Sequence, residues 1–166
     1  MIEKLTTLEL QKESMHFSAG HFTIFSETER EPMHGHNYHV SVALTTRVAE
    51  NGLSFDYRFY KSKIYVLCKQ LNQTFLMPAY SAYLQYQEDR DYWYFTFNHQ
   101  KLSFLKSDVT LLPVSNITVE ELSSWFITQL TEMEESLDKH HIEKIQVKVF
   151  SGPGQSGSAL WEKQKS

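Results

Sequence analysis

Hydrophobic and polar residues alternate along several short segments of this chain, a pattern typical of half-buried β-strands. In residues 37–48 the apolar side chains fall at every second position: Tyr38, Val40, Val42 and Leu44. Five further segments are expected to be strands: residues 8–25, 92–97, 101–105, 142–150 and 159–161. Three residues, Asn98, His99 and Gln100, separate the second and third of these five segments, which favours a hairpin.

The spacing of apolar residues changes to three and four in two other segments, which indicates amphipathic helices. The first helix is predicted to present one apolar face, made by Tyr57, Tyr60, Ile64, Leu67 and Leu71. The second begins near Thr118 and keeps the spacing through Val119, Leu122, Phe126, Leu130, Met133 and Leu137. Thr118 with Glu121 three residues later is the pattern of a capping box at a helix start.

The order of the predicted elements is strand, strand, helix, hairpin, helix and strand. Hairpin-joined strands favour an antiparallel sheet with the two helices on one face, which is an α+β fold. Polar residues 26–32 and 151–157 are expected to be loops. The length of 166 residues suits a single domain, predicted over residues 1–166. The open edges of such a sheet are either blunted or paired with another subunit, so a homo-oligomer is expected.

Composition excludes several function classes. The chain has 16 basic and 20 acidic residues, a net charge of −4 and no long basic run, so we expect no nucleic-acid partner. It has no run of about 18 apolar residues, so we expect no membrane span. One cysteine, Cys68, cannot form an internal disulfide, and the first residues lack the apolar stretch of a signal peptide. A cytoplasmic protein is therefore expected.

Histidines supply the sharpest candidate chemistry. On an extended backbone, residues i and i+2 point to the same side, so His34 and His36 can reach one ion. A catalytic zinc site takes three protein ligands and keeps an open position. His21, thirteen residues before His34, would stand beside the pair if the two strands form a hairpin. The pattern alone leaves open the alternative of surface histidines that flank a turn.

These residues also resemble the signature of a known family. Residues 17–21 (FSAGH) and 33–38 (MHGHNY), separated by a polar loop, look like the motif of the 6-pyruvoyl/6-carboxy-tetrahydropterin synthase family. Supporting similarities lie in four further segments: residues 54–57, 111–113, 116–120 and 147–159. The resemblance covers roughly residues 5–162.

The resemblance implies a tunnelling fold, or T-fold, in which subunits join their antiparallel sheets into a barrel. Such proteins are usually homohexamers built from two trimers, so a trimer or a hexamer is expected. The family holds Zn²⁺ on three histidines, which carries over to His21, His34 and His36. Its substrate is 7,8-dihydroneopterin triphosphate, and its members serve queuosine, folate and tetrahydrobiopterin routes. A small pterin-like substrate is thus the expected partner.

The catalytic base departs from the usual family pattern. The family places a cysteine four residues before the first histidine of the HGH motif, where this chain has Arg30. A variant branch uses a glutamate one residue later, and Glu31 occupies that place. A carboxylate can serve as the base that takes a substrate proton. Glu31 is therefore the candidate catalytic residue, and the alternative is a solvated loop acid.

Other matched positions are altered too. The family's proton-relay pair, Asp-His, is replaced by Asn72 and Gln73, whose amides do not titrate. The glutamate that anchors the pterin ring aligns with Ser151, which offers no bidentate carboxylate. Thr118 and Glu120 match the family's Asn-x-Thr-x-Glu run, and Glu120 is a candidate for ring recognition or simply a favourable charge at a helix start. These five residues are the candidate substrate-binding positions.

Three functions follow as hypotheses. The first is a zinc-dependent lyase that acts on 7,8-dihydroneopterin triphosphate or a related pterin-like heterocycle. The second is an enzyme that cleaves the side chain by a retro-aldol step and gives a 6-hydroxymethyl pterin. This step needs fewer proton transfers, which fits the loss of the Asp-His pair. The third is a non-catalytic protein that binds zinc and a heterocycle.

Overall fold

The structure is a computed structural model that describes residues 4–164. The strands are β1 Leu5–Leu10, β2 His16–His21, β3 His34–Arg47, β4 Thr74–Pro78, β5 Gln85–Asp89, β6 Tyr92–Phe97, β7 Gln100–Leu105, β8 Val109–Leu112, β9 Ile142–Gly152 and β10 Gln155–Glu162. The helices are α1 Arg58–Leu71, α2 Val119–Thr131 and α3 Glu134–Lys139, with a 3-10 turn at Lys106–Asp108. The single-domain prediction for residues 1–166 stays a prediction, and its ends, residues 1–3 and 165–166, lie outside the described residues.

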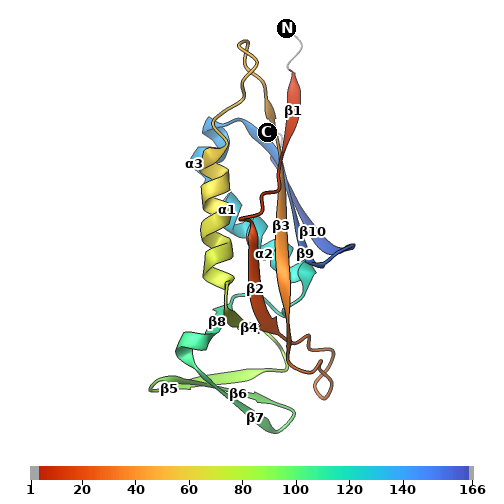
Figure 1. Ribbon diagram of the computed structural model, residues 1–166, viewed down its shortest axis with the longest axis vertical. Helices are drawn as coiled ribbons and strands as arrows, with labels where there is room; N and C mark the ends of the chain where they lie inside the picture. Colours follow the sequence, from red (N-terminus) through yellow and green to blue (C-terminus); the bar gives the residue numbers. More distant parts are fainter. Residues whose placement is uncertain (1–3, 165–166) are drawn as a thin grey trace.

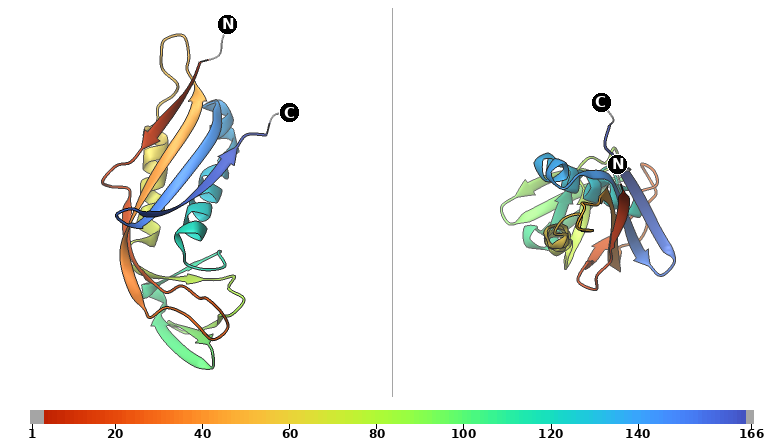
Figure 2. Two further views of the ribbon diagram at one scale, coloured as in Figure 1. Left: turned by 90° about the vertical axis from the view of Figure 1, so that its right-hand side faces the viewer. Right: turned by 90° about the horizontal axis from the view of Figure 1, so that it is seen from above.

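The main sheet has seven strands in the order β10-β9-β3-β2-β4-β8, and β1 also pairs with β3. β3 is its longest strand and is antiparallel to β1, β2 and β9. β1 and β2 pair in succession along one edge of β3, and β9 takes the other edge. The helices all lie on one face of this sheet (Figures 1 and 2). This confirms the predicted α+β arrangement with one face covered by helices.

Two details of the predicted fold are wrong. The sheet is mixed rather than purely antiparallel, because β4 runs parallel to both β2 and β8. There are three helices in residues 4–164 rather than two, because the second predicted helix ends at Thr131 and a separate helix, α3, begins at Glu134. Met133 and Leu137 still face the core, so the spacing of three and four continues across the break.

The boundaries of some predicted segments also differ. The predicted strand over residues 8–25 is two strands, because residues 11–15 turn away from the sheet, with the Met15 N–H bonded to the Lys12 carbonyl. The predicted loop over residues 151–157 belongs mostly to β9 and β10, which meet at a tight turn. Strands β4, β5 and β8 were not predicted. β4 is a short apolar segment, and a parallel strand buried on both faces shows no alternation.

The main core fills the space between this sheet and the helices. All four alternating apolar residues of β3 are buried, as the pattern predicted: Tyr38, Val40, Val42 and Leu44. They pack with the inner face of α1, where Tyr60, Ile64 and Leu71 are fully buried. Tyr57, predicted to share that face, precedes the helix and is exposed. The periodicity therefore identified the buried faces correctly and the helix start only approximately.

A second core lies at one end of the molecule, under the three-stranded sheet β5-β6-β7. Its buried members come from four parts of the chain: Phe22, Ile24, Met77, Leu84, Phe95 and Phe97. β6 and β7 form the predicted hairpin, and Asn98 and His99 at its turn both have positive φ, as in a type I′ turn. Phe22 and Ile24 follow β2, so this second core touches the segment that leads from β2 to β3 (Figure 1).

Gly157 lets β10 approach the start of α2. A Cβ at this position would lie 2.6 Å from the Val119 carbonyl carbon and 2.7 Å from the Glu120 backbone nitrogen. Both are backbone atoms of one helix end, so neither can move alone.

Replacing Gly157 with alanine is expected to lower the free energy of unfolding by about 1–3 kcal/mol, because the added methyl group overpacks this contact. Urea denaturation measures the change. Gly152→Ala is the matched control, since a Cβ there meets nothing within 4 Å and stability should hardly change. Equal stabilities of the two variants would contradict the close approach.

None of the helices in residues 4–164 has the length and hydrophobicity needed to cross a lipid bilayer.

Candidate metal and active site

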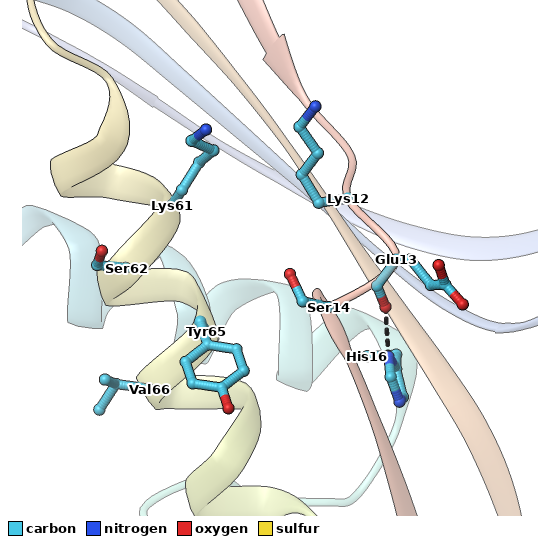
Figure 3. A pocket seen from close by; sticks show the side chains of 8 residues that line it. All are labelled: Lys12, Glu13, Ser14, His16, Lys61, Ser62, Tyr65 and Val66. Atoms are coloured by element: carbon cyan, nitrogen blue, oxygen red, sulfur yellow. Dashed lines mark hydrogen bonds between the residues drawn. The ribbon is translucent and has the colours of Figure 1, made fainter.

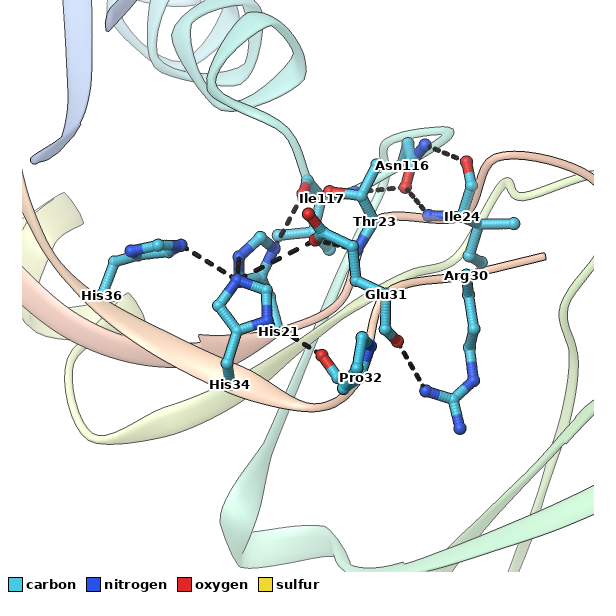
Figure 4. Close-up of polar contacts among 10 residues, drawn as sticks. All are labelled: His21, Thr23, Ile24, Arg30, Glu31, Pro32, His34, His36, Asn116 and Ile117. Atoms are coloured by element: carbon cyan, nitrogen blue, oxygen red, sulfur yellow. Dashed lines mark hydrogen bonds and ion pairs between the residues drawn. The ribbon is translucent and has the colours of Figure 1, made fainter. Parts of the chain in front are cut away.

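The pairing of β2 with β3 brings three histidines together. His21 at the end of β2 lies opposite His34, the first residue of β3, and His36 lies opposite Ala19. The Nε2 atom of His34 is 3.1 Å from Nε2 of His21 and 3.1 Å from Nε2 of His36 (Figure 4). All three ligand atoms lie within 4.8 Å of one another. The hairpin expected from the sequence therefore forms, and it gathers the three predicted ligands.

Backbone carbonyls fix which nitrogen of two rings faces the cluster. His21 Nδ1 lies 3.0 Å from the Ile117 carbonyl oxygen, and His34 Nδ1 lies 2.8 Å from the Pro32 carbonyl oxygen. A carbonyl can only accept, so both Nδ1 atoms donate and both neutral rings present a bare Nε2. Two lone pairs that face each other repel unless a cation lies between them.

These residues fit a metal ion. Ligand atoms on a tetrahedral Zn²⁺ lie about 3.3 Å apart for Zn–N bonds of about 2.0–2.1 Å, close to the separations seen here. Burial lowers the pKa of His21 below its ordinary value of 6.5, although the Ile117 carbonyl opposes this effect, and burial also lowers the pKa of His36. A neutral imidazole is the form that binds a metal. The three histidines can therefore hold one metal ion.

Gly35, between the two β3 ligands, passes close to β2. A Cβ on Gly35 would lie 3.0 Å from the Ala19 carbonyl oxygen. The glycine thus allows the two strands to pack closely at the point where His21 and His34 face each other.

Glu31 lies beside the histidine cluster. Its Oε2 accepts the backbone N–H of Thr23 at 2.9 Å and stands 3.9 Å from His34 Nε2. Burial alone would raise the pKa of Glu31, but the hydrogen bonds from Thr23, together with the electrostatic influence of the neighbouring imidazoles, outweigh it, so the pKa lies below its ordinary value. Glu31 is therefore a half-buried carboxylate beside the three histidines, and its role as the base stays a prediction.

Asn116 supports the same loop and was not singled out as a site residue. Its Oδ1 accepts the Ile24 N–H at 3.1 Å, and its Nδ2 donates to the Ile24 carbonyl at 2.8 Å. The next residue, Ile117, supplies the carbonyl that orients His21. Asn116 stands in the Asn-x-Thr-x-Glu run, which is the sequence signal that could have identified it.

Asn72 and Gln73 lie where α1 ends, next to β2. The Asn72 side chain is engaged in the fold, because its Oδ1 accepts the Ser18 N–H at 2.9 Å. Gln73 has a φ of 61° and its N–H donates to the Ser18 carbonyl at 2.7 Å. Gln73 also lines a hollow of about 470 Å³ together with Gly35 and His36. Of the two residues, Gln73 therefore borders the space next to His36, a candidate metal ligand.

Ser151 borders a different hollow, of about 560 Å³, which also reaches His36. This hollow runs past the β9–β10 turn. His36 thus stands between two hollows, one lined by Gln73 and one by Ser151.

Thr118 and Glu120 lie at the start of α2. Thr118 is the N-cap, and its Oγ1 accepts the Glu121 N–H at 3.2 Å. This is the predicted cap, but the Glu121 carboxylate turns to the Ser115 N–H instead of completing a capping box. Glu120 is exposed on the first turn of the helix. A role for Thr118 and Glu120 in substrate binding stays a prediction.

A broad hollow of about 810 Å³ lies away from this site, between α1 and the connection from β1 to β2 (Figure 3). Lys12 and Lys61 stand on its two sides, and His16 lines one end. His16 begins β2 and His21 ends it, so the strand separates this hollow from the histidine cluster.

Comparisons with known proteins agree with this geometry. The family model of 6-pyruvoyl tetrahydropterin synthase matches residues 9–159. A Methanocaldococcus jannaschii protein named "Putative 6-carboxy-5,6,7,8-tetrahydropterin synthase" is 26% identical over 142 residues, which cover 85% of this chain and 86% of that protein.

Solved structures give the same result. The crystal structure of 6-pyruvoyl tetrahydropterin synthase from Plasmodium vivax matches with a TM-score of 0.91 and 29% identity, covering 97% of this chain and 100% of that one. A variant of the P. vivax enzyme, with a glutamate replaced by alanine and described as a catalytic residue mutant, also matches with a TM-score of 0.91, at 28% identity. The likeness confirms the expected T-fold.

Proposed function

The chain belongs to the 6-pyruvoyl tetrahydropterin synthase family, and from this premise we propose that it is a zinc-dependent lyase acting on 7,8-dihydroneopterin triphosphate or a closely related pterin. One observation carries the proposal: three converging histidine Nε2 atoms with a carboxylate oxygen 3.9 Å from one of them. Such an arrangement combines a metal site with a base, which is what removal of a proton from a hydroxyl-bearing carbon requires.

Three histidines are the proposed metal ligands. His21, His34 and His36 hold the ion through Nε2, and the Ile117 and Pro32 carbonyls keep two of the rings oriented. When bound, Zn²⁺ supplies Lewis acidity that polarises the hydroxyl oxygens of the substrate side chain.

Glu31 is the proposed base. Its Oε2 accepts the Thr23 N–H and lies 3.9 Å from His34 Nε2, so the carboxylate is held beside the three histidines, where it can take the substrate proton. The P. vivax enzyme, whose glutamate variant is described as a catalytic residue mutant, supports a carboxylate in this role.

The hollows beside His36 are the proposed space for the substrate ring. Gln73 and Ser151 line them from opposite sides, and both offer hydrogen bonds without charge. We assign them to substrate binding and not to proton transfer.

The hydrogen bond of the Asn72 side chain to β2 favours a second candidate reaction, retro-aldol cleavage. Neither Asn72 nor Gln73 titrates, and the Asn72 side chain is bonded to β2, so this segment offers no second proton-transfer group. A retro-aldol cleavage needs one base. Glu31 would remove the proton of the second side-chain hydroxyl, and the bond between the first and second side-chain carbons would break. A two-carbon aldehyde would leave with its triphosphate, and the first carbon would take the proton from Glu31 and become the 6-hydroxymethyl group.

Purified, zinc-loaded protein incubated with 7,8-dihydroneopterin triphosphate decides between the candidates, with products followed by mass spectrometry. Triphosphate release with a 6-pyruvoyl or 6-carboxy pterin supports the synthase reaction. A 6-hydroxymethyl pterin with a phosphorylated aldehyde supports the retro-aldol reaction. Binding without any product, at full zinc content, contradicts both and leaves a zinc- and heterocycle-binding protein.

We also propose that copies of the chain associate into a trimer or a hexamer. Within residues 4–164, β10 pairs with β9 alone, and its outer edge is open. An open edge presents unpaired N–H and C=O groups that a strand of another copy can satisfy.

A further inference from the structure

Arg30, the neighbour of Glu31, links the candidate active site to the second core. Its Nη1 donates to the Glu31 carbonyl oxygen at 2.7 Å (Figure 4). Its guanidinium carbon also lies 4.6 Å from the ring centroid of Phe22 and 5.8 Å from that of Phe97. Phe97 ends β6, so Arg30 joins the loop before β3 to the three-stranded sheet.

The rings of Phe22 and Phe97 give the Arg30 guanidinium a rigid surface to pack against. Phe22 and Phe97 are 1% and 3% exposed and belong to the second core. An arginine side chain is always charged, and its flat guanidinium stacks on aromatic faces while its N–H groups still donate. Arg30 is itself half-buried, which strengthens both contacts. The guanidinium therefore has a defined place against the core.

Three hydrogen bonds hold the residue that carries the carboxylate. The Glu31 N–H donates to the Thr23 carbonyl, and the Thr23 N–H donates to Glu31 Oε2, both at 2.9 Å. The third is the bond from Arg30 to the Glu31 carbonyl. Thr23 belongs to the same connection between β2 and β3, whereas the Arg30 bond ties Glu31 to a side chain packed on the second core.

We propose that Arg30 is a positioning residue for Glu31, and that the sheet β5-β6-β7 acts through Arg30 as the support of the loop that carries the base. This inference rests on the proposed function, because it gives Glu31 a reaction to perform. A misplacement of a catalytic group by about 1 Å can lower the rate about 100-fold, so loss of the Arg30 contacts should have a measurable effect on kcat.

Direct binding of an anionic substrate by Arg30 is the competing role. Arg30 borders a hollow of about 620 Å³, but Glu29 and Glu31 line the same hollow. The lining thus has two acidic residues against one arginine, which disfavours an anionic group there. The positioning role therefore agrees better with the charges.

The test compares Arg30→Met, Arg30→Lys and Lys101→Met. Methionine keeps an unbranched apolar stem but has no donor, and lysine keeps the charge and a donor. Lys101 is the matched control, because its Nζ lies 4.1 Å from the Tyr94 ring centroid on the same three-stranded sheet. Steady-state kinetics, zinc content, and hydrogen–deuterium exchange of the peptide over residues 22–33 are measured for each protein.

In Arg30→Met, kcat is expected to fall about 10- to 100-fold with KM and zinc content unchanged. Exchange in residues 22–33 should become about 10-fold faster, because the loop opens more often. Arg30→Lys should recover part of kcat, and Lys101→Met should match the unsubstituted protein. In a Glu31→Gln background, Arg30→Met should cause no further loss of kcat, since the group it positions is gone.

Other results overturn the inference. A raised KM with unchanged kcat would make Arg30 a substrate ligand, and a lowered melting temperature with unchanged kcat would make it a structural residue only. If the unsubstituted protein shows no turnover, the proposed function fails, but the exchange measurement still decides about Arg30. If exchange in residues 22–33 becomes faster in Arg30→Met but not in Lys101→Met, Arg30 stabilises the loop. If exchange in Arg30→Met is unchanged, it does not.

Discussion

Replacing Glu31 with glutamine is expected to lower turnover by about 10²- to 10⁴-fold and to leave the zinc content unchanged. Glutamine has nearly the same shape, and its amide oxygen can still accept the Thr23 N–H that holds Oε2 in place. The amide cannot take a proton at neutral pH, so only the basic function is lost. Product formation by mass spectrometry and zinc content by elemental analysis measure the two effects separately.

Glu29→Gln is the matched control for this prediction. Glu29 is exposed on the same loop, and its hydrogen bonds with residues 25 and 26 use its backbone carbonyl and N–H rather than its carboxylate. The same loss of negative charge should therefore leave turnover nearly unchanged. If Glu31→Gln retains the turnover of the Glu29→Gln protein, another group is the base and the assignment is wrong.

Replacing His34 with alanine is expected to weaken zinc binding by more than about 100-fold and to abolish turnover. His34 Nε2 lies 3.1 Å from both other Nε2 atoms, so its loss leaves two ligands. The zinc retained against a competing chelator measures the affinity. A chelator should also lower the melting temperature of the unsubstituted protein, because a bound ligand stabilises only the folded state, and His34→Ala should abolish this shift.

His39→Ala, in the same strand, controls for the loss of an imidazole. His39 is exposed and lies outside the group of three histidines that can share one ion. Full zinc content is therefore expected in this variant. Full zinc content in His34→Ala as well would show that the ion binds elsewhere.

Buried faces and neighbouring side chains were predicted correctly where the sequence has a short periodic pattern. The alternation of Tyr38, Val40 and Val42 identified the buried face of β3, because every second side chain of a strand points to the same face of the sheet. The pair His34 and His36 followed from the same rule. The hairpin at Asn98 was predicted because its turn and both of its strands are contiguous in the chain.

Contacts between distant segments were not predictable in this way. The parallel pairing of β4 with β2 and β8 leaves no mark in a five-residue apolar segment. The hydrogen bonds of Asn116 to Ile24 join residues 92 positions apart. Likewise, nothing in the sequence around Arg30 shows that its side chain meets Phe97. Spacing along the chain shows which face of an element is buried, but not which element packs against it.

The central place of β3 has a consequence for how the chain folds. Its edge toward β1 and β2 is completed within the first 47 residues, so these three strands can assemble as soon as they are synthesised. Its other edge pairs with β9, about 100 positions later in the chain. Until then that edge of β3 offers unpaired backbone groups beside an apolar face, the kind of transient surface that recruits chaperones or aggregates. The last hairpin, β9–β10, is the element that covers this edge of β3.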